Sequence, residues 1–275
     1  MDPTDIERPV NIVGGSREAP VTMRVSDLSV TYRKRERAGR SVAALNGITF
    51  EIHSGETLGI VGESGCGKTT LVRALARLLV PTAGKITLGE IDVLNAQGGE
   101  LREFRRHLQV VFQDPRGSLD PRMRLADIIS EPLRLLRGGM HAVAIQSAVF
   151  RSLDQVGLPR AFAIKYPHEC SGGQCQRVGI ARATIIRPRL VICDEAVSAL
   201  DVSVQAQIVN LLLELQTELN MAMLFISHNL PIVRHVSHRI AVMRGGRIVE
   251  LGEAKQVCGH ARHPYTRELL RSSYL

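Results

Sequence analysis

The sequence predicts an α/β protein, in which a mostly buried β-sheet is covered by helices and interrupted by a helical insert. Short apolar or alternating runs recur along the chain with segments of helical character between them, as is typical of this fold class. Strand signals then disappear between Pro115 and Pro188, where apolar residues recur at helical spacing. We therefore expect a sheet domain with a helical subdomain inserted at about residues 115–187.

The individual runs indicate where the strands lie. Four runs are apolar throughout, as expected of strands covered on both faces, and predict the central sheet: residues 57–61, 108–112, 190–193 and 221–226. Residues 24–32 and 48–53 alternate apolar with polar side chains and predict half-buried strands. Gly245 and Gly246 separate residues 239–243 from 247–251, which predicts a closing hairpin.

The length and composition suit one large folded domain. The 275 residues are 44% apolar and 23% charged, which is ordinary for a protein with a buried core. Residues 1–21 lack the apolar core of a signal peptide, and no later stretch approaches the ~20 apolar residues of a membrane span. We expect a flexible tail at residues 1–21, one large domain at 22–258, a short helical tail at 259–275, and a cytoplasmic location.

The charge and the cysteines narrow the function only slightly. The net charge of +8 is compatible with nucleic acid, an anionic membrane surface or simple solubility. Aromatic residues make up 4% of the chain and do not stud its basic groups, so solvated faces with some attraction to acidic lipid are favoured over nucleic-acid binding. The five cysteines show no paired metal-ligand spacing and are expected to be reduced thiols.

The strongest chemical signal is residues 62–69, Gly-Glu-Ser-Gly-Cys-Gly-Lys-Thr, which match the phosphate-loop pattern G-x-x-x-x-G-K-[ST]. The pattern follows the buried strand ending at Val61 and precedes a helix expected to run from Thr69 through Leu78. Its glycines let backbone N–H groups turn around a phosphate, and the helix N-terminus adds positive potential. Lys68 is expected to reach the β- and γ-phosphates, and the Thr69 hydroxyl to bind magnesium. The strand-loop-helix context argues against the alternative, a chance glycine-rich turn.

A second element of phosphate chemistry is the apolar run that ends in Asp194 and Glu195. Because successive side chains of a strand point in opposite directions, the two carboxylates are expected to serve different roles. Asp194 would hold magnesium through its water shell, and Glu195 would polarise the attacking water. Taken alone, the pair is explained at least as well by a strand that ends in solvated acids.

Two single residues gain meaning from their positions. Gln113 follows the run at residues 108–112, and His228 follows the run at 221–226. Both are therefore expected at the carboxyl edge of the sheet, where open α/β sheets bind ligands. A lone glutamine or histidine after a strand is usually structural, but beside a phosphate loop and an acidic strand end these become candidate γ-phosphate and magnesium sensors.

Residues 170–174, Cys-Ser-Gly-Gly-Gln, followed by Gln176 and Arg177, resemble the signature sequence of the ATP-binding cassette (ABC) transporter ATPases. The resemblance covers roughly residues 22–272 and includes the family's other motifs in order. These are the Walker A loop at residues 62–69, the Q-loop glutamine Gln113, Walker B at 190–195, the D-loop at 198–201 and the H-loop histidine His228. The resemblance implies the ABC ATPase fold of P-loop nucleoside triphosphatases, with a mixed central sheet, N-terminal antiparallel strands and an inserted helical subdomain.

The resemblance also implies ATP and Mg²⁺ as cofactors. Glu195, His228 and Gln113 match the family's catalytic residues, and Thr69, Gln113 and Asp194 match its magnesium-binding residues. The implied ATP-binding residues are the adenine-stacking Tyr32, the loop residues Gly62, Glu63, Ser64, Gly65, Cys66, Gly67, Lys68, Thr69 and Thr70, the signature residues Ser171, Gly172, Gly173 and Gln174, and Asp201.

Three further segments resemble one branch of the family, the oligopeptide, dipeptide and nickel importers, and there the second of two ATPase subunits. They are residues 112–122, 166–170 and 263–266. Cys170 stands where leucine is usual in the signature, an exchange of one apolar residue for another that we expect to be mild. Ala196 stands where many relatives have proline, and in this position the sequence is similar to nickel-type relatives, which also have alanine. A peptide importer is favoured, with a nickel importer as the alternative.

An importer ATPase of this type implies two membrane permease subunits and a second ATPase subunit, a copy or a paralogue, in a head-to-tail dimer. It also implies an extracytoplasmic solute-binding protein as an indirect partner, no nucleic acid, and a peripheral place on the cytoplasmic face of the cell (inner) membrane. A soluble ABC ATPase acting on DNA or ribosomes usually has two cassettes or a long coiled coil, and this sequence has neither. A non-hydrolysing regulator would lack Glu195 or His228, and both are present.

Overall fold

The computed structural model describes residues 19–33 and 41–273. The expected flexible tail at residues 1–21 therefore lies almost entirely outside the described residues. Its last residue, Val21, already belongs to the first β-strand. Among the described residues, no helix is both long enough and apolar enough to cross a membrane.

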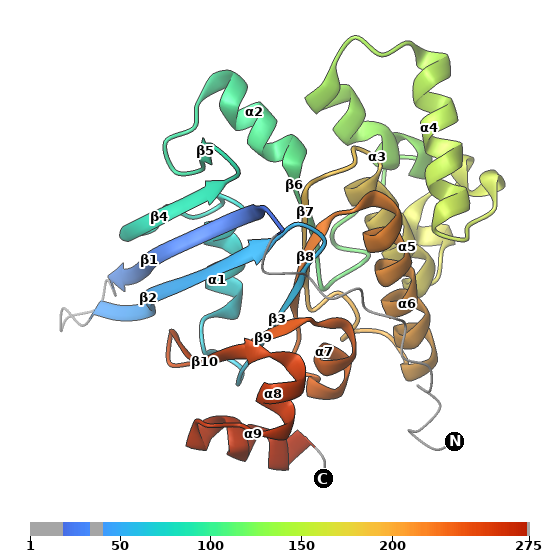
Figure 1. Cartoon of the computed structure of the whole chain (residues 1–275). Coiled ribbons are helices and arrows are strands. Elements are labelled where there is room, and N and C mark those ends of the chain that lie inside the picture. Colours follow the sequence, from blue (N-terminus) through green and yellow to red (C-terminus); the bar gives the residue numbers. More distant parts are fainter. Residues whose placement is uncertain (1–18, 34–40, 274–275) are drawn as a thin grey trace.

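The larger of two sheets has six strands in the order β10-β9-β3-β8-β7-β6 (Figure 1). Neighbouring strands from β9 to β6 run parallel, and β10 is antiparallel to β9, so the predicted mixed central sheet is confirmed. The strands are β3 (Thr57–Val61), β6 (Leu108–Val111), β7 (Leu190–Asp194), β8 (Ala222–Ile226), β9 (Arg239–Arg244) and β10 (Arg247–Glu253). The four apolar runs thus form four adjacent parallel strands.

A smaller antiparallel sheet lies beside the first, with the strand order β2-β1-β4-β5. Its strands are β1 (Val21–Arg33), β2 (Ser41–His53), β4 (Ala83–Leu88) and β5 (Ile91–Asp92). The sequence predicts most of β1 and the last six residues of β2, but not β4 or β5. Only Ile86 and Leu88 of β4 are buried, and two buried positions are too short a pattern to stand out.

Helix α1 (Lys68–Leu75) follows the phosphate loop. It is shorter than the sequence predicts, since the predicted helix continues through Leu78. Arg77 has a left-handed φ of +54°, which ends the helix, and the Arg77 guanidinium donates a hydrogen bond to the carbonyl of Ala96. Leu78 consequently lies outside the helix and is exposed.

The chain between β6 and β7 is described throughout and forms helices and turns. Its helices are α3 (Leu125–Pro132), the π-helical turn η1 (Leu133–Arg137), α4 (Ala142–Gln155), the short 3₁₀ turns η2 (Arg160–Ile164) and η3 (Pro167–Glu169), and α5 (Gly172–Thr184). The other helices are α2 (Gly98–His107), α6 (Val202–Leu219), α7 (Leu230–Val236), α8 (Ala254–Gly259) and α9 (Pro264–Ser273).

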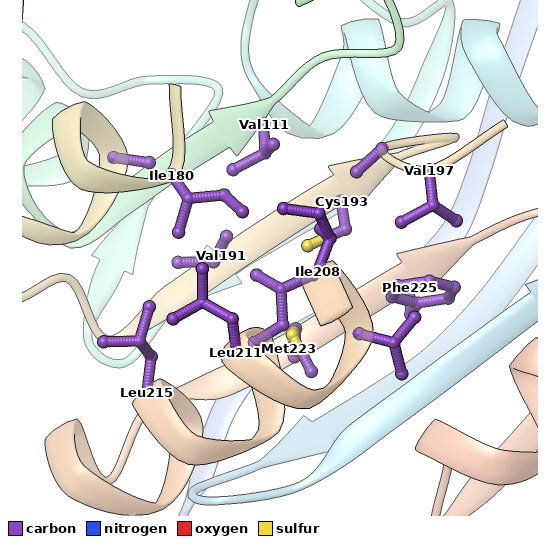
Figure 2. Packing of buried hydrophobic residues seen from close by; sticks show 14 of the residues in the cluster. Val111, Ile180, Val191, Cys193, Val197, Ile208, Leu211, Leu215, Met223 and Phe225 are labelled. Atoms are coloured by element: carbon purple, nitrogen blue, oxygen red, sulfur yellow. The ribbon is translucent and has the colours of Figure 1, made fainter. Parts of the chain in front are cut away.

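The six-stranded sheet separates two apolar cores. Val191 and Cys193 of β7 pack on one face with residues of α5 and α6, such as Ile180 and Ile208 (Figure 2). The alternate β7 residues Leu190 and Ile192 belong to the core on the other face, together with Leu71 and Leu75 of α1. Helix α1 and helix α5 therefore lie on opposite faces of the sheet (Figure 1). This separation decides which motifs can share a site within one chain.

Candidate nucleotide-binding site

The phosphate loop is the turn from β3 into α1. Gly65 and Gly67 have φ values of +80° and +113°, which glycine adopts readily. A Cβ atom on Gly67 would lie 2.5 Å from the carbonyl oxygen of Ala44, so glycine is required there for space as well. From beneath the loop, the backbone N–H of Gly246 donates to the carbonyl of Cys66 at 2.9 Å. The β9–β10 hairpin therefore supports the loop.

Lys68 is folded back over its own loop and is 7% exposed. Its Nζ donates to the carbonyl oxygens of Gly62 at 2.6 Å and Glu63 at 2.9 Å, and lies 3.7 Å from Sγ of Cys66. A buried cation needs such partners. Glu63, Ser64, Gly65 and Thr69 are exposed, Gly67 and Thr70 are half-buried, and Gly62 and Cys66 are buried.

Asp194 is the last residue of β7 and lies within electrostatic reach of the phosphate loop. Burial raises the pKa of its carboxyl group, as does the charge of Glu195, while Lys68 and Arg73 of α1 act in the opposite direction. The carboxylate is thus held in a place where its negative charge is costly unless a cation joins it. A carboxylate in such a place is a ligand that Mg²⁺ accepts.

Glu195 is not part of the strand, contrary to the sequence-based picture of two alternating strand residues. It lies just beyond β7 with a left-handed φ of +48°. Its N–H donates to the carbonyl of Ile226 at 2.9 Å, and its carbonyl accepts from N and Oγ of Ser198 at 3.1 and 2.8 Å. These bonds hold a backbone conformation that costs about 1 kcal/mol or more for a non-glycine residue.

His228 meets Glu195 at the same edge of the sheet. Its Nδ1 lies 3.5 Å from Oε2 of Glu195, and the side chains are 62% and 22% exposed respectively. Strand β8, which precedes His228, lies between β3 and β7. The histidine therefore emerges between the phosphate loop and the acidic strand end, with its ring open to solvent.

Gln113 is exposed and lies two residues beyond the end of β6, which stops at Val111 rather than at Phe112. Two arginines tie the segment that follows it to helix α5 and to the residue before the cap of that helix. Arg116 donates to the carbonyl of Cys170 at 3.0 Å, and Arg182 of α5 donates to the carbonyl of Ser118 at 2.7 Å. Sequence reasoning missed both arginines, because an isolated arginine carries no local signal of a carbonyl 54 or 64 residues away.

The signature residues start helix α5. The hydroxyl of Ser171 caps the helix by accepting from the N–H of Gln174 at 3.2 Å, and the side-chain oxygen of Gln174 accepts from the N–H of Ser171 at 2.9 Å. A Cβ atom on Gly173 would lie 2.8 Å from Val204 of α6, so α5 and α6 approach closely here. Ser171 is exposed, but α5 begins on the other face of the sheet from α1. The phosphate loop and the signature residues of one chain therefore do not lie together in one site.

The two remaining candidate contacts lie at element ends. Tyr32 lies near the end of β1, opposite Val42 of β2, and is 41% exposed. Asp201 caps α6 by accepting from the N–H of Val204 at 3.0 Å, and its carboxylate also accepts from Oγ of Ser203 at 2.7 Å. The side-chain bond to Ser203 and the backbone bonds lower the pKa of Asp201. The cap is therefore charged at neutral pH.

The cysteines in these motifs are packing residues. Cys66, Cys170, Cys175 and Cys193 are buried free thiols. Burial, with the nearby charge of Asp194, raises the pKa of Cys193 to about 12. Burial also raises the pKa of Cys170, whose Sγ lies 3.7 Å from the carbonyl of Tyr166. A thiol therefore fills the place of the usual leucine without exposing a polar group.

Comparison with known proteins agrees with this geometry. The ABC transporter family model matches residues 45–198. The oligopeptide transport ATP-binding protein OppF of Salmonella typhimurium is 45% identical over 256 residues, 91% of this chain and 77% of that protein. The dipeptide transport ATP-binding protein DppF of Lactococcus lactis is 45% identical over 258 residues, 93% and 82% of the two chains. A dimeric post-hydrolysis structure of the ATP-binding cassette MJ0796, bound to ADP and Pi, aligns with a TM-score of 0.75 and 27% identity over 84% of this chain and 98% of that one. The chain therefore belongs to the ABC transporter family, among the ATP-binding subunits related to oligopeptide and dipeptide transport proteins.

Proposed function

We propose that this chain hydrolyses ATP to drive the import of peptides across a cell membrane. The observation that carries the proposal is the 3.5 Å contact between His228 and Glu195, at the sheet edge that also bears the phosphate loop and Asp194. A phosphate cradle, a half-buried acid and a carboxylate in contact with a histidine are suited to the attack of water on a γ-phosphate.

In this proposal, Lys68 donates to β- and γ-phosphate oxygens while the carbonyls of Gly62 and Glu63 hold its ammonium in the loop. The N–H groups at the start of α1 face the same phosphates. Thr69, Asp194 and Gln113 would hold Mg²⁺, which when bound neutralises charge on the phosphate oxygens. Tyr32, exposed near the end of β1, would stack on the adenine.

Glu195 would orient the attacking water and accept its proton. Its fixed backbone and its contact with His228 limit the positions that its carboxylate can take, which reduces the entropy lost on reaching the transition state. His228 would therefore act both on Glu195 and, from its place between β3 and β7, on the γ-phosphate.

Ser171 would complete the site of a second ATPase subunit, because its helix lies on the opposite face of the sheet from its own phosphate loop. An exposed N-terminus of a 13-residue helix, with a serine hydroxyl, suits a phosphate. Two subunits arranged head to tail would thus form two shared sites, and Asp201 would lie near the subunit boundary. The related cassette MJ0796 is itself dimeric in its post-hydrolysis state, which supports such a pairing.

The remaining partners follow from the transporter role. The helical segment after Gln113 would receive the coupling helix of one of two membrane permease subunits, with the Arg116 and Arg182 contacts carrying movement between it and α5. A solute-binding protein would deliver cargo from the other side of the membrane, and the chain would sit on the cytoplasmic face. Peptide is preferred to nickel because the relatives named above are oligopeptide and dipeptide transport proteins.

A glutamate-to-glutamine change tests the proposed chemistry. Glu195→Gln should lower steady-state phosphate release by at least about 10²-fold, because an amide is a far weaker base than a carboxylate. ATP binding should persist, since Lys68 and the loop are intact. Glu214→Gln makes the same change at an exposed position on α6 and should leave turnover unchanged. Near-normal hydrolysis by Glu195→Gln would remove this residue from the proposed role.

A further inference from the structure

A side chain of helix α9 contacts the phosphate loop. Tyr265, the second residue of α9, is 2% exposed, and its hydroxyl accepts a hydrogen bond from the backbone N–H of Glu63 at 3.1 Å. The two residues are 202 positions apart in the sequence. The guanidinium of Arg244 at the end of β9 covers the Tyr265 ring, 4.6 Å from its centroid.

The peptide group that Tyr265 contacts is the one that also holds Lys68. The N–H of Glu63 and the C=O of Gly62 belong to the same peptide plane and point in opposite directions. Tyr265 holds the N–H side, and Lys68 Nζ holds the carbonyl side at 2.6 Å. Gly62 has a φ of +158°, and a Cβ atom there would lie 2.3 Å from the carbonyl oxygen of Met243. Glycine is therefore required at position 62, and Tyr265 and Lys68 hold the two sides of the peptide that follows it.

The turn that carries Tyr265 is itself fixed by hydrogen bonds. The carboxylate of Glu250 on β10 accepts from the backbone N–H groups of Arg262 at 2.8 Å and His263 at 3.0 Å. Nδ1 of His263 then accepts from the N–H of Tyr265 at 3.2 Å. The segment at residues 263–266, which in the sequence serves only as a marker of the family branch, thus aims one hydroxyl at the loop.

We propose that Tyr265 is a positioning residue for nucleotide binding, because its hydroxyl fixes the Gly62–Glu63 peptide and through it the Lys68 ammonium. This inference rests on the phosphate-binding role that the proposed function gives to Lys68. A phenylalanine would fill the buried space of the ring equally well. The inference therefore depends on the hydroxyl of Tyr265. Without it, the loop would have to be ordered during binding, which lowers affinity.

Titration calorimetry of the full chain with MgADP tests the hydroxyl directly. Tyr265→Phe keeps the ring beneath Arg244 and should raise the ADP dissociation constant about 3- to 10-fold, the usual effect of one lost hydrogen bond. Ser272→Ala removes a hydroxyl that bonds only within α9, to the carbonyl of Leu269, and should leave the constant unchanged. The fitted stoichiometry separates weaker sites from unfolded protein, since unfolding lowers the number of sites and not their affinity.

Lys68→Ala distinguishes failure of this inference from failure of the proposed function. If Lys68→Ala weakens ADP binding while Tyr265→Phe binds ADP as the wild type does, the positioning role is wrong and the Lys68 role stands. If Tyr265→Phe lowers only the stoichiometry, Tyr265 is a packing residue and the inference is overturned. If Lys68→Ala leaves ADP binding unchanged, the proposed phosphate contact itself is wrong.

Discussion

Asp194 combines burial with a like charge next to it, and both raise the pKa of its carboxyl group. The ionised form that magnesium requires is therefore disfavoured in the protein alone. An arrangement of this kind lowers the stability of the folded protein and is common at functional sites. The left-handed backbone of Glu195 lowers stability in the same way. Hydrogen bonds that Ser198 donates to its carbonyl, and that its own N–H donates to the carbonyl of Ile226, keep it in place.

Asp194→Asn should make the nucleotide-free protein more stable at neutral pH, raising the thermal unfolding midpoint by a few degrees. The pKa of Asp194 is higher in the folded protein than in the unfolded chain. Between these two pKa values the folded protein binds more protons than the unfolded chain, so the stability of the wild type falls as the pH rises through this range. Asparagine does not ionise and avoids this loss. The higher stability of the variant should therefore vanish when the pH is below the ordinary pKa of aspartate. Thermal melts from pH 3 to 8 measure it, and a variant less stable at pH 7 would contradict the burial argument.

At the level of elements, the segment after Gln113 and helix α5 are joined by arginines that donate to backbone carbonyls. Arg182 lies largely within the packed helical region, and burial lowers the pKa of its guanidinium. Its bond to the carbonyl of Ser118 at 2.7 Å offsets that cost. The segment and the signature helix should consequently move together.

Arg182→Met should lower the free energy of unfolding by about 1–3 kcal/mol, because methionine fills much of the space but leaves the Ser118 carbonyl without its donor. Urea denaturation followed by circular dichroism gives the value. Arg151→Met, at an exposed position on α4, should change it by less than about 0.5 kcal/mol. Equal losses for the two variants would show that the Arg182 bond contributes nothing specific.

Sequence patterns predict the elements whose signals are local and miss those that depend on distant contacts. The buried parallel strands and the phosphate loop carry their signals within a few residues, and all four apolar runs form strands within one residue of their predicted ends. The predicted end of α1 is wrong because apolar spacing at Leu75 and Leu78 cannot reveal the left-handed Arg77. The sequence marks Tyr265 only as part of a family motif, since its partner Glu63 lies 202 residues away.

At the scale of the whole molecule, the six-stranded sheet keeps the phosphate loop and the signature helix on separate faces (Figure 1). In the proposed function, each chain therefore carries the two halves of a nucleotide site on opposite faces of the sheet. Hydrolysis would depend on the approach of a second subunit, which links the chemical step to a movement between chains.

Ser171→Arg should abolish hydrolysis by the assembled transporter and leave MgADP binding to the isolated chain unchanged. Arginine removes the cap of α5 at a cost of about 1 kcal/mol and, in the proposed dimer, would fill the space that receives a phosphate of the other subunit. Calorimetry on the isolated chain and phosphate release from the complex separate the two effects. If ADP affinity falls together with hydrolysis, Ser171 acts within its own chain and the shared-site arrangement is wrong.

Uptake of a labelled short peptide tests the central proposal most directly. Cells in which the gene is deleted would be complemented with the wild type or with Glu195→Gln, and the amount of each protein measured alongside uptake. We expect the wild type to restore peptide uptake, Glu195→Gln at the same protein level to restore none, and nickel-dependent enzyme activity to be normal throughout. Normal peptide uptake in the deletion strain, with nickel starvation in its place, would contradict the assignment of this chain to peptide import.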